Sequence, residues 1–277
     1  MTKPMLCKEW KEDKAQTYTS CFMQPKLDGI RCIATFVNNE VVLMSRNEKP
    51  LSLPHLTSDL IKFFSRVTST KFLDGELYLH GTSFQEVASL VKRANHPLQD
   101  KISYHIYDRQ FIDRLGNNRS FGKRFYELNI DMLNLKHVTK VLTKYVSTEE
   151  AANRAHATFV LQGYEGSIYR TNRCEYQEGK RSPDLLKRKD WQEDDFPVIG
   201  VREGKGKNEG TAVFTCQVGT DEKITFDVTA QGTYEEKAAL FRIKSKVIGM
   251  RLSIKYQNLT DAGIPRFPIA LGFKEDR

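Results

Sequence analysis

The sequence has few cysteines and no long hydrophobic segment. Its five cysteines are Cys7, Cys21, Cys32, Cys174 and Cys216. They form no Cys-x-x-Cys pair and are odd in number, which argues against a zinc site or a disulfide framework. No run approaches the roughly 20 apolar residues that span a bilayer, and charges interrupt the N-terminus before any signal-peptide core can form. We therefore expect a cytoplasmic protein without a membrane partner.

Charge is distributed unevenly along the 277 residues, which carry a net charge of +8. Residues 192–277 hold 13 Lys and Arg against 13 Asp and Glu, whereas residues 1–191 hold 30 against 22. The N-terminal part therefore carries the whole basic excess. Such an excess favours a polyanionic partner such as nucleic acid, although ordinary solubility is an equal explanation from charge alone.

Strand and helix patterns alternate in the first part of the chain. Two strand-like runs, at residues 33–37 and 41–44, flank Asn38-Asn39, a favourable hairpin turn. Residues 83–86 and 147–150 have capping-box spacing, and the second predicts a helix that ends near residue 161. Another helix is predicted by Phe125, Leu128 and Met132. These patterns predict an α+β domain over residues 1–192.

The sequence pattern of the second part of the chain indicates a small β-domain. Residues 191–197 are acidic and end at Pro197, which predicts a boundary between residues 192 and 193. Strand-like runs follow at residues 198–201, 211–218, 224–228 and 250–256. A capped helix beginning near Thr233 lies among them. Short strands with one helix predict a small β-barrel of the OB type over residues 193–277.

Six consecutive residues, Lys26-Leu27-Asp28-Gly29-Ile30-Arg31, place a lysine beside a carboxylate, a glycine and an arginine. A lysine amine is a nucleophile only when it is neutral, and free lysine titrates near about 10.4, so nearby cations or a metal must favour the neutral form. Gly29 permits close backbone approach, and the Arg31 guanidinium can hold a ribose or a phosphate. Alone, this pattern is also typical of a turn between two strands.

Four further motifs follow in order along the chain. They are Asp74-Gly75-Glu76 closing an apolar run, Tyr107-Asp108 ending a predicted strand, Glu165-Gly166 after a predicted helix, and residues 184–189. Together with the lysine motif, their order and spacing resemble covalent nucleotidyltransferases, which include ATP-dependent DNA ligases, RNA ligases and mRNA capping enzymes. The tail at residues 255–268 is most similar to that of small two-domain DNA ligases of phage or bacterial type.

The resemblance implies a fold and an activity. The fold is an ATP-grasp-like nucleotidyltransferase domain followed by an OB domain. The activity is ATP-dependent sealing of 5′-phosphate/3′-hydroxyl nicks in duplex DNA by a monomer, in a bacterial cell or a phage-infected host. In this family AMP moves from ATP to a lysine and then to the 5′-phosphate, and the 3′-hydroxyl finally displaces AMP.

By resemblance, four residues contact the nucleotide. Lys26 would carry the AMP, while Gln24 and Arg31 would bind the nucleotide beside it. Tyr107 would stack on the purine, and a core tyrosine is an equal alternative for that residue alone. Stacking does not distinguish ATP from GTP.

Two further residues would act on the DNA. Asp28 would lie beside the reacting ends in the later steps. Arg46 would bind the 5′-phosphate of the nick, since a guanidinium suits a phosphate. An exposed arginine at a strand end is the alternative for Arg46.

Glu76 and Glu165 are the candidate metal ligands. Phosphoryl transfer uses hard oxygen ligands for Mg²⁺, with Mn²⁺ as a substitute. The resemblance assigns the metal to Glu165, and the ribose or a metal to Glu76. Isolated glutamates are more often solvated surface charges, but each of these two adjoins a glycine in a strand context.

The candidate cations at the phosphates are Lys187, Lys189 and Lys274. Lys187 and Lys189 are two residues apart, so a strand would place both on one face, where they could neutralise the departing pyrophosphate. Larger relatives have a C-terminal arginine that orients the pyrophosphate. Lys274 stands at the nearest match, and a lysine supplies charge without the bidentate fork.

Two groups of cations in the second domain are candidates for DNA contact. Lys205 and Lys207 lie in a glycine-rich stretch that reads as a hairpin turn rather than a phosphate loop, because a strand and not a helix follows it. Arg242 and Lys244 belong to a second basic strip. A duplex-facing surface and a solvated helix end are equal alternatives for that strip.

Two other functions remain open from the sequence. An RNA ligase or an mRNA capping guanylyltransferase would use much of the same residue set. A non-catalytic nucleic-acid-binding relative would form no nucleotide adduct at Lys26. The tail and the short N-terminal lead favour the DNA ligase.

Overall fold

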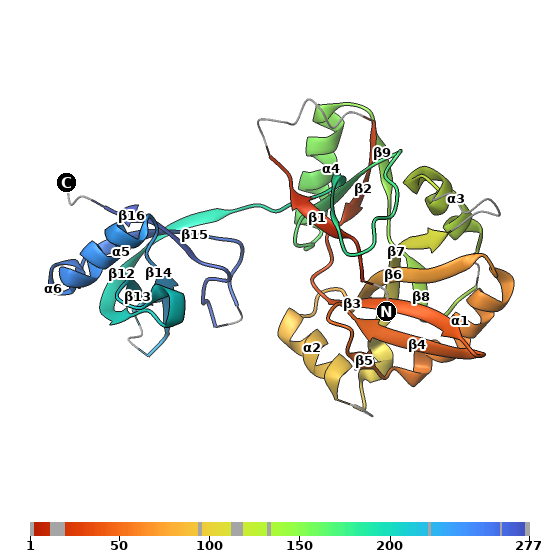
Figure 1. The fold of residues 1–277 in the computed structure, drawn as a ribbon, viewed down its shortest axis with the longest axis horizontal. Coiled ribbons are helices and arrows are strands. Elements are labelled where there is room, and N and C mark those ends of the chain that lie inside the picture. The colour runs from red at the N-terminus through yellow and green to blue at the C-terminus, as the bar shows by residue number, and fades with distance from the viewer. Residues whose placement is uncertain are drawn as a thin grey trace. The chain divides into compact units, whose positions relative to one another are not determined.

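The computed structural model describes residues 3–11, 20–93, 96–111, 119–131, 134–220, 223–260 and 262–274. The chain forms two compact units, Met1–Lys189 and Asp190–Arg277, coloured red to green and green to blue in Figure 1. Each unit has its own hydrophobic core. The predicted boundary at residue 192 lies three residues beyond this division. Within the described residues, no helix has both the length and the apolar character required to cross a bilayer.

The first unit contains a five-stranded sheet next to helix α4 (Figure 1). In spatial order its strands are β1 (Leu6–Glu9), β11 (Arg181–Arg188), β10 (Ser167–Thr171), β2 (Cys21–Pro25) and β9 (Lys144–Val146). Helix α4 (Glu149–Leu161) covers one face of this sheet, where Phe159 packs with Met23 and Leu186. Strand β1 pairs with β11 in parallel, so the start of the chain lies next to the strand that carries Lys187.

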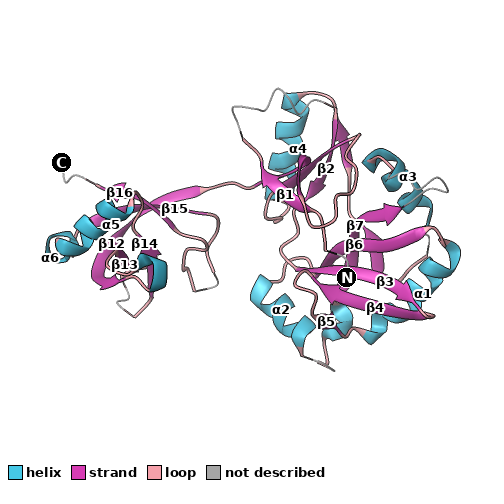
Figure 2. Cartoon of the chain, viewed as in Figure 1, coloured by secondary structure: helices cyan, strands magenta, loops and turns pink. Residues whose placement is uncertain are grey.

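The same unit contains a six-stranded sheet, visible with its helices in Figure 2. In spatial order its strands are β5 (Pro50–Leu51), β4 (Glu40–Ser45), β3 (Ile30–Val37), β6 (Thr70–Tyr78), β7 (Ser103–Phe111) and β8 (Val138–Lys140). Its helical elements are α1 (Pro54–Arg66), α2 (Phe84–Lys92), η2 (Gln99–Lys101) and α3 (Phe121–Asp131). Helices α1 and α2 bury Phe63, Leu60 and Val87 in its main core. The unit contains both strands and helices, and most of its strand pairs are antiparallel, in agreement with the predicted α+β composition.

A third apolar cluster joins the two sheets. Ile33 and Phe72 come from the six-stranded sheet, and Leu185 comes from the five-stranded one. Phe121 of α3 and Met5 complete the contact. Because both sheets pack through these side chains, polar residues beyond the edge of this cluster are brought to one place.

Local signals predicted the turn and most helix starts correctly. Asn38 and Asn39 have positive φ, as a two-residue hairpin turn between β3 and β4 requires. Ser83 caps α2 by accepting a hydrogen bond from the Glu86 amide. The predicted cap at Ser147 is wrong by one residue, since Thr148 accepts from the Ala151 amide. Met132 lies outside the described residues.

Two predicted strand ends are strand interiors. Asp74-Gly75-Glu76 lies inside β6, and Tyr107-Asp108 lies inside β7, which continues to Phe111. A carboxylate in a sequence normally suggests a strand end, but these aspartates are buried and paired with arginines. The ion pairs therefore allow the strands to continue through charged positions.

In its described residues, the second unit is a curled five-stranded sheet with two α-helices and one 3₁₀-helix. In spatial order its strands are β14 (Thr225–Thr229), β13 (Ala212–Gln217), β12 (Gln192–Glu203), β15 (Arg251–Tyr256) and β16 (Ile269–Phe273). Its helical elements are η3 (Gly206–Asn208), α5 (Tyr234–Arg242) and α6 (Lys244–Val247). The outer strands β14 and β16 have Cα atoms within 8 Å of each other, although the described residues form no ladder between them. Thr233 and Glu236 form the predicted capping box of α5.

The acidic segment that predicted the domain boundary belongs to a strand. Residues 192–197 form the first half of β12 and pair with β15 from Tyr256 to Arg251. Asp195 accepts a hydrogen bond from Ser253 and forms an ion pair with Lys274, and Asp194 accepts from the Tyr256 hydroxyl. These partners compensate the acidic charges, so the strand can begin within three residues of the boundary between the units.

Candidate active site

Backbone hydrogen bonds join Lys26 directly to Glu165 and Gly166. Strand β2 ends one residue before Lys26, and β10 begins one residue after Gly166. The Lys26 amide donates to the Gly166 carbonyl over 2.9 Å, and the Glu165 amide donates to the Lys26 carbonyl over 3.1 Å. Gly166 has φ +150°, and a Cβ there would overlap the Arg188 carbonyl oxygen. Glycine at this position therefore brings the ends of β2, β10 and β11 together.

Two lysines share one carboxylate at this junction. The Lys26 ammonium contacts Oε2 of Glu165, and the Lys189 ammonium contacts Oε1. Burial alone would raise the pKa of Glu165, but attraction to Lys26 and Lys189 outweighs burial and holds that pKa below its usual value. Burial and repulsion from Lys26 lower the pKa of Lys189. The structure thus brings Lys26, Glu165 and Lys189 into one ionic cluster.

Arg31, Glu76 and Tyr107 form a second group of candidate residues. The Arg31 guanidinium makes a bidentate ion pair with Asp74, at 2.9 and 2.6 Å. Its central carbon lies 5.4 Å from the Tyr107 ring centroid. The Tyr107 hydroxyl lies 3.4 Å from Oε2 of Glu76. A guanidinium, an aromatic face and a carboxylate are therefore within reach of a single nucleotide.

Glu76 is held in a partly enclosed position next to the lysine motif. A Cβ at Gly29 would overlap the Leu77 carbonyl oxygen and lie 2.9 Å from Cγ of Glu76, so glycine allows the two segments to approach. Burial raises the pKa of Glu76 to about 8, although the charges of Arg31 and Lys26 oppose this shift. The Glu165 carboxylate contributes to the increase. The carboxyl of Glu76 therefore binds a proton more readily than an ordinary glutamate.

Gln24 has a fixed amide orientation. Its Nε2 donates to the Tyr107 carbonyl over 3.2 Å and to the Thr143 hydroxyl over 3.0 Å. Its Oε1 accepts from Nε of Arg170 over 3.1 Å. Because a carbonyl can only accept and a guanidinium can only donate, these partners define which end of the amide is oxygen. Gln24 is buried, and it lies against the backbone of the residue predicted to stack on the purine.

A buried ion network supports this region, and the sequence did not reveal it. Asp108 accepts from Arg124 at 2.8 and 2.9 Å and from Arg170 at 2.7 Å, with all three side chains at most 3% exposed. Asp74 plays the corresponding part for Arg31 and also accepts from the Tyr176 hydroxyl. In the sequence, Asp74 and Asp108 were visible only as charged residues next to strand-like runs. The partners lie on separate elements, so spacing could not identify them.

The remaining candidates of the first unit have different environments. Asp28 is half-buried, and its charge contributes, after burial and Tyr164, to raising the pKa of Tyr78 to about 12. Arg46 is exposed in the turn that follows β4. The Lys187 ammonium pairs with Oε1 of Glu9 at 2.7 Å rather than with Glu165. Its positive charge contributes to lowering the pKa of Lys189. The roles of these residues stay predictions.

The candidates of the second unit lie on its surface. Lys205 and Lys207 occupy the loop between β12 and β13, where antiparallel pairing confirms the predicted hairpin. Arg242 ends α5 and Lys244 begins α6, and both are exposed. Lys274 follows β16 and lies 2.5 Å from Oδ2 of Asp195. Contact of these cations with DNA or ATP stays a prediction.

The carboxylates of the first unit fit a weakly coordinated divalent cation. No group of three or more His, Cys, Asp or Glu arranged to hold a metal occurs within the described ranges. Mg²⁺, however, keeps several waters and needs only one or two carboxylates together with substrate phosphates. Burial is the main cause of the raised pKa of Glu76, and the charge of Glu165 adds to it, so a bound cation would stabilise the ionised form of Glu76.

Comparison with known proteins agrees with this arrangement. Residues 4–189 match the model of the ATP dependent DNA ligase domain, and residues 203–274 match that of the DNA ligase OB-like domain. The DNA ligase of African swine fever virus (isolate Pig/Kenya/KEN-50/1950) is 28% identical over 99% of this chain and 69% of its own length. The DNA ligase of Haemophilus influenzae is 26% identical over 88% of this chain and 83% of its own length.

Solved structures share the fold. A Lig E DNA ligase, described as binding DNA with a minimal scaffold, has a TM-score of 0.78 at 21% identity and covers 99% of this chain and 100% of its own. The ATP-dependent DNA ligase of bacteriophage T7, in complex with ATP, has a TM-score of 0.59 at 19% identity and covers 98% of both chains. Because the ligase-domain model alone matches more than half of the residues, the chain belongs to the family of ATP-dependent DNA ligases.

Proposed function

We propose that this protein seals nicks in duplex DNA through a covalent AMP adduct at Lys26. The observation that carries the proposal is the Lys26 contact with Glu165, whose other carboxylate oxygen binds Lys189. A nucleophilic lysine needs a fixed position and a cationic neighbour that disfavours its own protonation. An ordinary surface lysine needs neither.

Three displacements at phosphorus complete the reaction. First, the neutral amine of Lys26 attacks the α-phosphorus of ATP; a P–N bond forms, the bond to pyrophosphate breaks, and the amine loses a proton. Second, an oxygen of the DNA 5′-phosphate attacks the AMP phosphorus, and Lys26 leaves and regains a proton. Third, the 3′-hydroxyl attacks the 5′-phosphate phosphorus, loses its proton and releases AMP.

Different residues of the first unit bind different parts of the nucleotide. Tyr107 stacks on the purine beside Gln24, and Arg31 binds the ribose or a phosphate. Lys189, with Lys187 next to it, neutralises the departing pyrophosphate. Glu76 and Glu165 hold Mg²⁺, or Mn²⁺ as a substitute, which when bound stabilises the charge that develops on the phosphate oxygens.

The DNA contacts involve both units of a monomeric enzyme. Asp28 lies beside the reacting ends, and Arg46 binds the 5′-phosphate. We also infer that the second unit is a closed OB barrel, in line with its curled sheet and the approach of β14 to β16. Lys205, Lys207, Arg242 and Lys244 then contact the backbone of the duplex.

Mass spectrometry of the intact protein tests the proposal. After incubation with ATP and Mg²⁺, the protein should gain the mass of one AMP at Lys26, and nicked duplex DNA should then remove it. Lys26→Ala should abolish the gain, whereas the matched surface variant Lys71→Ala, at an exposed pair with Glu178, should retain it. Retained ATP-dependent sealing by Lys26→Ala would refute the mechanism.

Substrate comparisons separate the two enzymatic alternatives. Labelling by GTP and not by ATP would indicate a capping guanylyltransferase. Sealing of nicks flanked by RNA strands, with DNA nicks left open, would indicate an RNA ligase. Absence of any adduct would leave a non-catalytic nucleic-acid-binding relative.

A further inference from the structure

A further basic region lies on the first unit, and its lining includes none of Lys26, Glu165 and Lys189. We call it the basic pocket: an open cavity of about 750 Å³ on strands β1, β10 and β11. Its cations are Lys8, Lys11, Arg173, Arg181 and Lys187. Its two acidic residues are Glu9 and Asp184, so the lining has an excess of three positive charges.

The two carboxylates of the basic pocket are already compensated. Glu9 pairs with Lys187 at 2.7 Å. Asp184 accepts from the Thr171 hydroxyl at 2.7 Å and lies 3.7 Å from the Arg173 guanidinium. Within the described ranges, neither Lys8 nor Lys11 forms an ion pair. The remaining cations therefore attract an anion from outside the protein.

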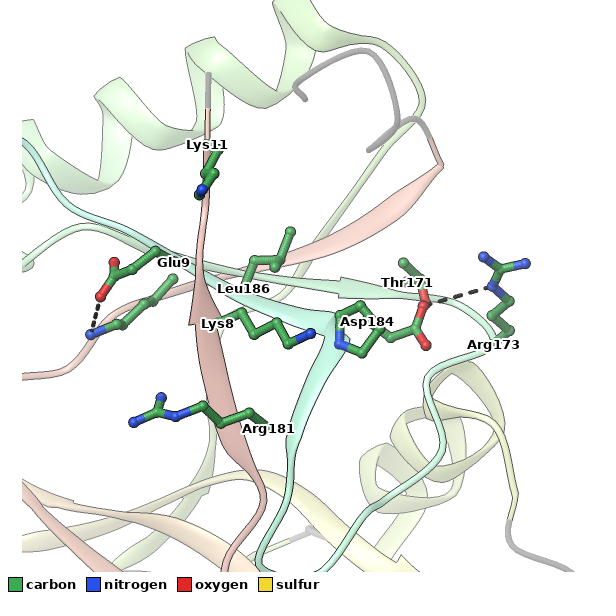
Figure 3. A pocket seen from close by; sticks show the side chains of 10 residues that line it. Lys8, Glu9, Lys11, Thr171, Arg173, Arg181, Asp184 and Leu186 are labelled. Atoms are coloured by element: carbon green, nitrogen blue, oxygen red, sulfur yellow. Dashed lines mark hydrogen bonds and ion pairs between the residues drawn. The ribbon is translucent and has the colours of Figure 1, made fainter. Parts of the chain in front are cut away.

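The cations are spread along the sheet rather than directed at one point. Figure 3 shows Lys11, Lys8 and Arg181 at successive positions along β1 and the neighbouring β11. Arg181 pairs with Leu6, and Lys11 follows Leu6 by five residues, which at about 3.3 Å per residue of extended chain places Arg181 and Lys11 up to roughly 17 Å apart. A single compact anion cannot contact all of them. A strand with a charge every ~3.4 Å along the duplex axis can.

Lys187 connects the basic pocket to the proposed active site. It lines the pocket, and its charge acts on Lys189, which contacts Glu165. A phosphate chain that reaches Lys189 can therefore continue over Lys187 and along β11 towards Arg181. Strand β1 is the edge of the sheet, so no further strand covers this route among the described residues.

We propose that the basic pocket binds the phosphodiester backbone of one DNA strand as that strand leaves the nick. The proposal rests on the proposed function, because it requires DNA at the Lys26 site. It adds an anchoring surface that stabilises the DNA complex without contacting the reacting atoms. The ligand is a continuous backbone, rather than ATP or pyrophosphate.

The double variant Lys8→Ala/Lys11→Ala tests the proposal. Neither side chain forms a hydrogen bond or ion pair in the described structure, so the fold should be retained. Because the variant cannot bind two of the phosphates, the slope of log Kd for nicked duplex against log salt should decrease by about 1.8. The loss of affinity between 50 and 200 mM salt should then be about 12-fold smaller than in the parent. Lys26 adenylation by ATP should be unchanged.

The matched control is Lys62→Ala/Lys101→Ala, which removes two exposed lysines from the side of α1 and η2. It should bind nicked DNA with the slope of the parent. Arg181→Ala provides a third variant, expected to reduce the slope by about 0.9. Its guanidinium donates to the Cys7 carbonyl, so thermal unfolding should accompany that measurement.

Three outcomes would overturn the proposal. Parental affinity and slope in Lys8→Ala/Lys11→Ala would exclude a DNA contact. Equal losses of affinity in the two double variants would show that DNA responds to the total positive charge of the protein and not to the basic pocket. An increased ATP requirement for adenylation at parental DNA affinity would assign the pocket to nucleotide phosphates. If the parent itself formed no Lys26 adduct, the proposed function would fail separately.

Discussion

Nη1 of Arg170 lies 2.7 Å from Oδ2 of Asp108, and this buried ion pair connects the two sheets of the first unit. Arg124 of α3 binds the same carboxylate from another side. Arg170 also donates to Gln24, whose amide in turn holds the Tyr107 carbonyl. The position of the proposed purine-stacking tyrosine thus depends on charges that never face solvent.

Asp108→Asn should destabilise the first unit strongly. Removing one member of a buried ion network leaves the arginines uncompensated, which typically costs about 3–5 kcal/mol. Urea unfolding followed by fluorescence would measure the free energy. Glu178→Gln, at the exposed pair with Lys71, should cost less than about 1 kcal/mol. Similar losses of stability in both variants would show that the network adds little.

The same carboxylate should make stability sensitive to acid. Burial opposes ionisation of Asp108, but Arg124 and Arg170 outweigh it and hold its pKa below the usual value. The contribution is therefore present above about pH 4 and is lost as the pH falls through the folded-state pKa. The difference in unfolding free energy between wild type and Asp108→Asn should shrink with acidification. A constant difference would contradict this assignment.

Glu165→Gln should reduce adenylation more than folding. The variant loses the negative charge that binds both Lys26 and Lys189, and each charge-assisted hydrogen bond is worth about 1.5–3 kcal/mol. Loss of one such bond in the transition state corresponds to at least about a 10-fold slower reaction. Single-turnover formation of the AMP adduct would measure the rate. Glu175→Gln, at an exposed glutamate, should react like the parent.

Arg46→Ala should separate the first chemical step from the last. Arg46 is exposed in the turn after β4 and would meet DNA rather than ATP. Adenylation of Lys26 should therefore proceed at the parental rate, while sealing of nicked DNA slows by about 10-fold or more, because one charged hydrogen bond is missing. Lys49→Ala, at a neighbouring exposed lysine, is the control. Equal losses of both steps in Arg46→Ala would argue against a DNA role.

The turn and the helix caps could be predicted from the sequence because the residues that form them are neighbours in the chain. The Asn38-Asn39 turn and the caps of α2 and α5 depend on residues at most three apart. The lysine motif was also readable, since its residues are consecutive. What it could not show is that Lys26 pairs through its backbone with Gly166, 140 positions later.

The sequence was least informative where distant partners compensate a local charge. The acidic run before Pro197 predicted only a boundary, and did not show that Ser253, Tyr256 and Lys274 satisfy its aspartates inside a sheet. Asp108 suggested the end of a strand, yet Arg124 and Arg170 allow it to remain in the interior of β7. Neither set of partners can be found by periodicity, because each depends on how the elements pack.

Glu76 should give the enzyme a pH dependence opposite to that of Asp108. Burial raises its folded-state pKa to about 8, so the native protein binds a proton that the unfolded chain releases near about pH 4.3. Its contribution to stability is complete below the unfolded pKa and is lost as the pH rises through about 8. Between these limits, wild type should lose up to about 1.4 kcal/mol per pH unit relative to Glu76→Gln.

Urea unfolding of both proteins at pH 5, 6.5 and 8 would measure this difference. Glu76→Gln should gain stability relative to wild type at each step, and the gain should shrink when Mg²⁺ is added, because a cation that binds the ionised carboxylate lowers its pKa. The Mg²⁺ effect requires only folded protein and no turnover. If the difference in unfolding free energy between the two proteins were independent of pH, Glu76 would be ionised over the whole range. It would then need no cation to remain ionised.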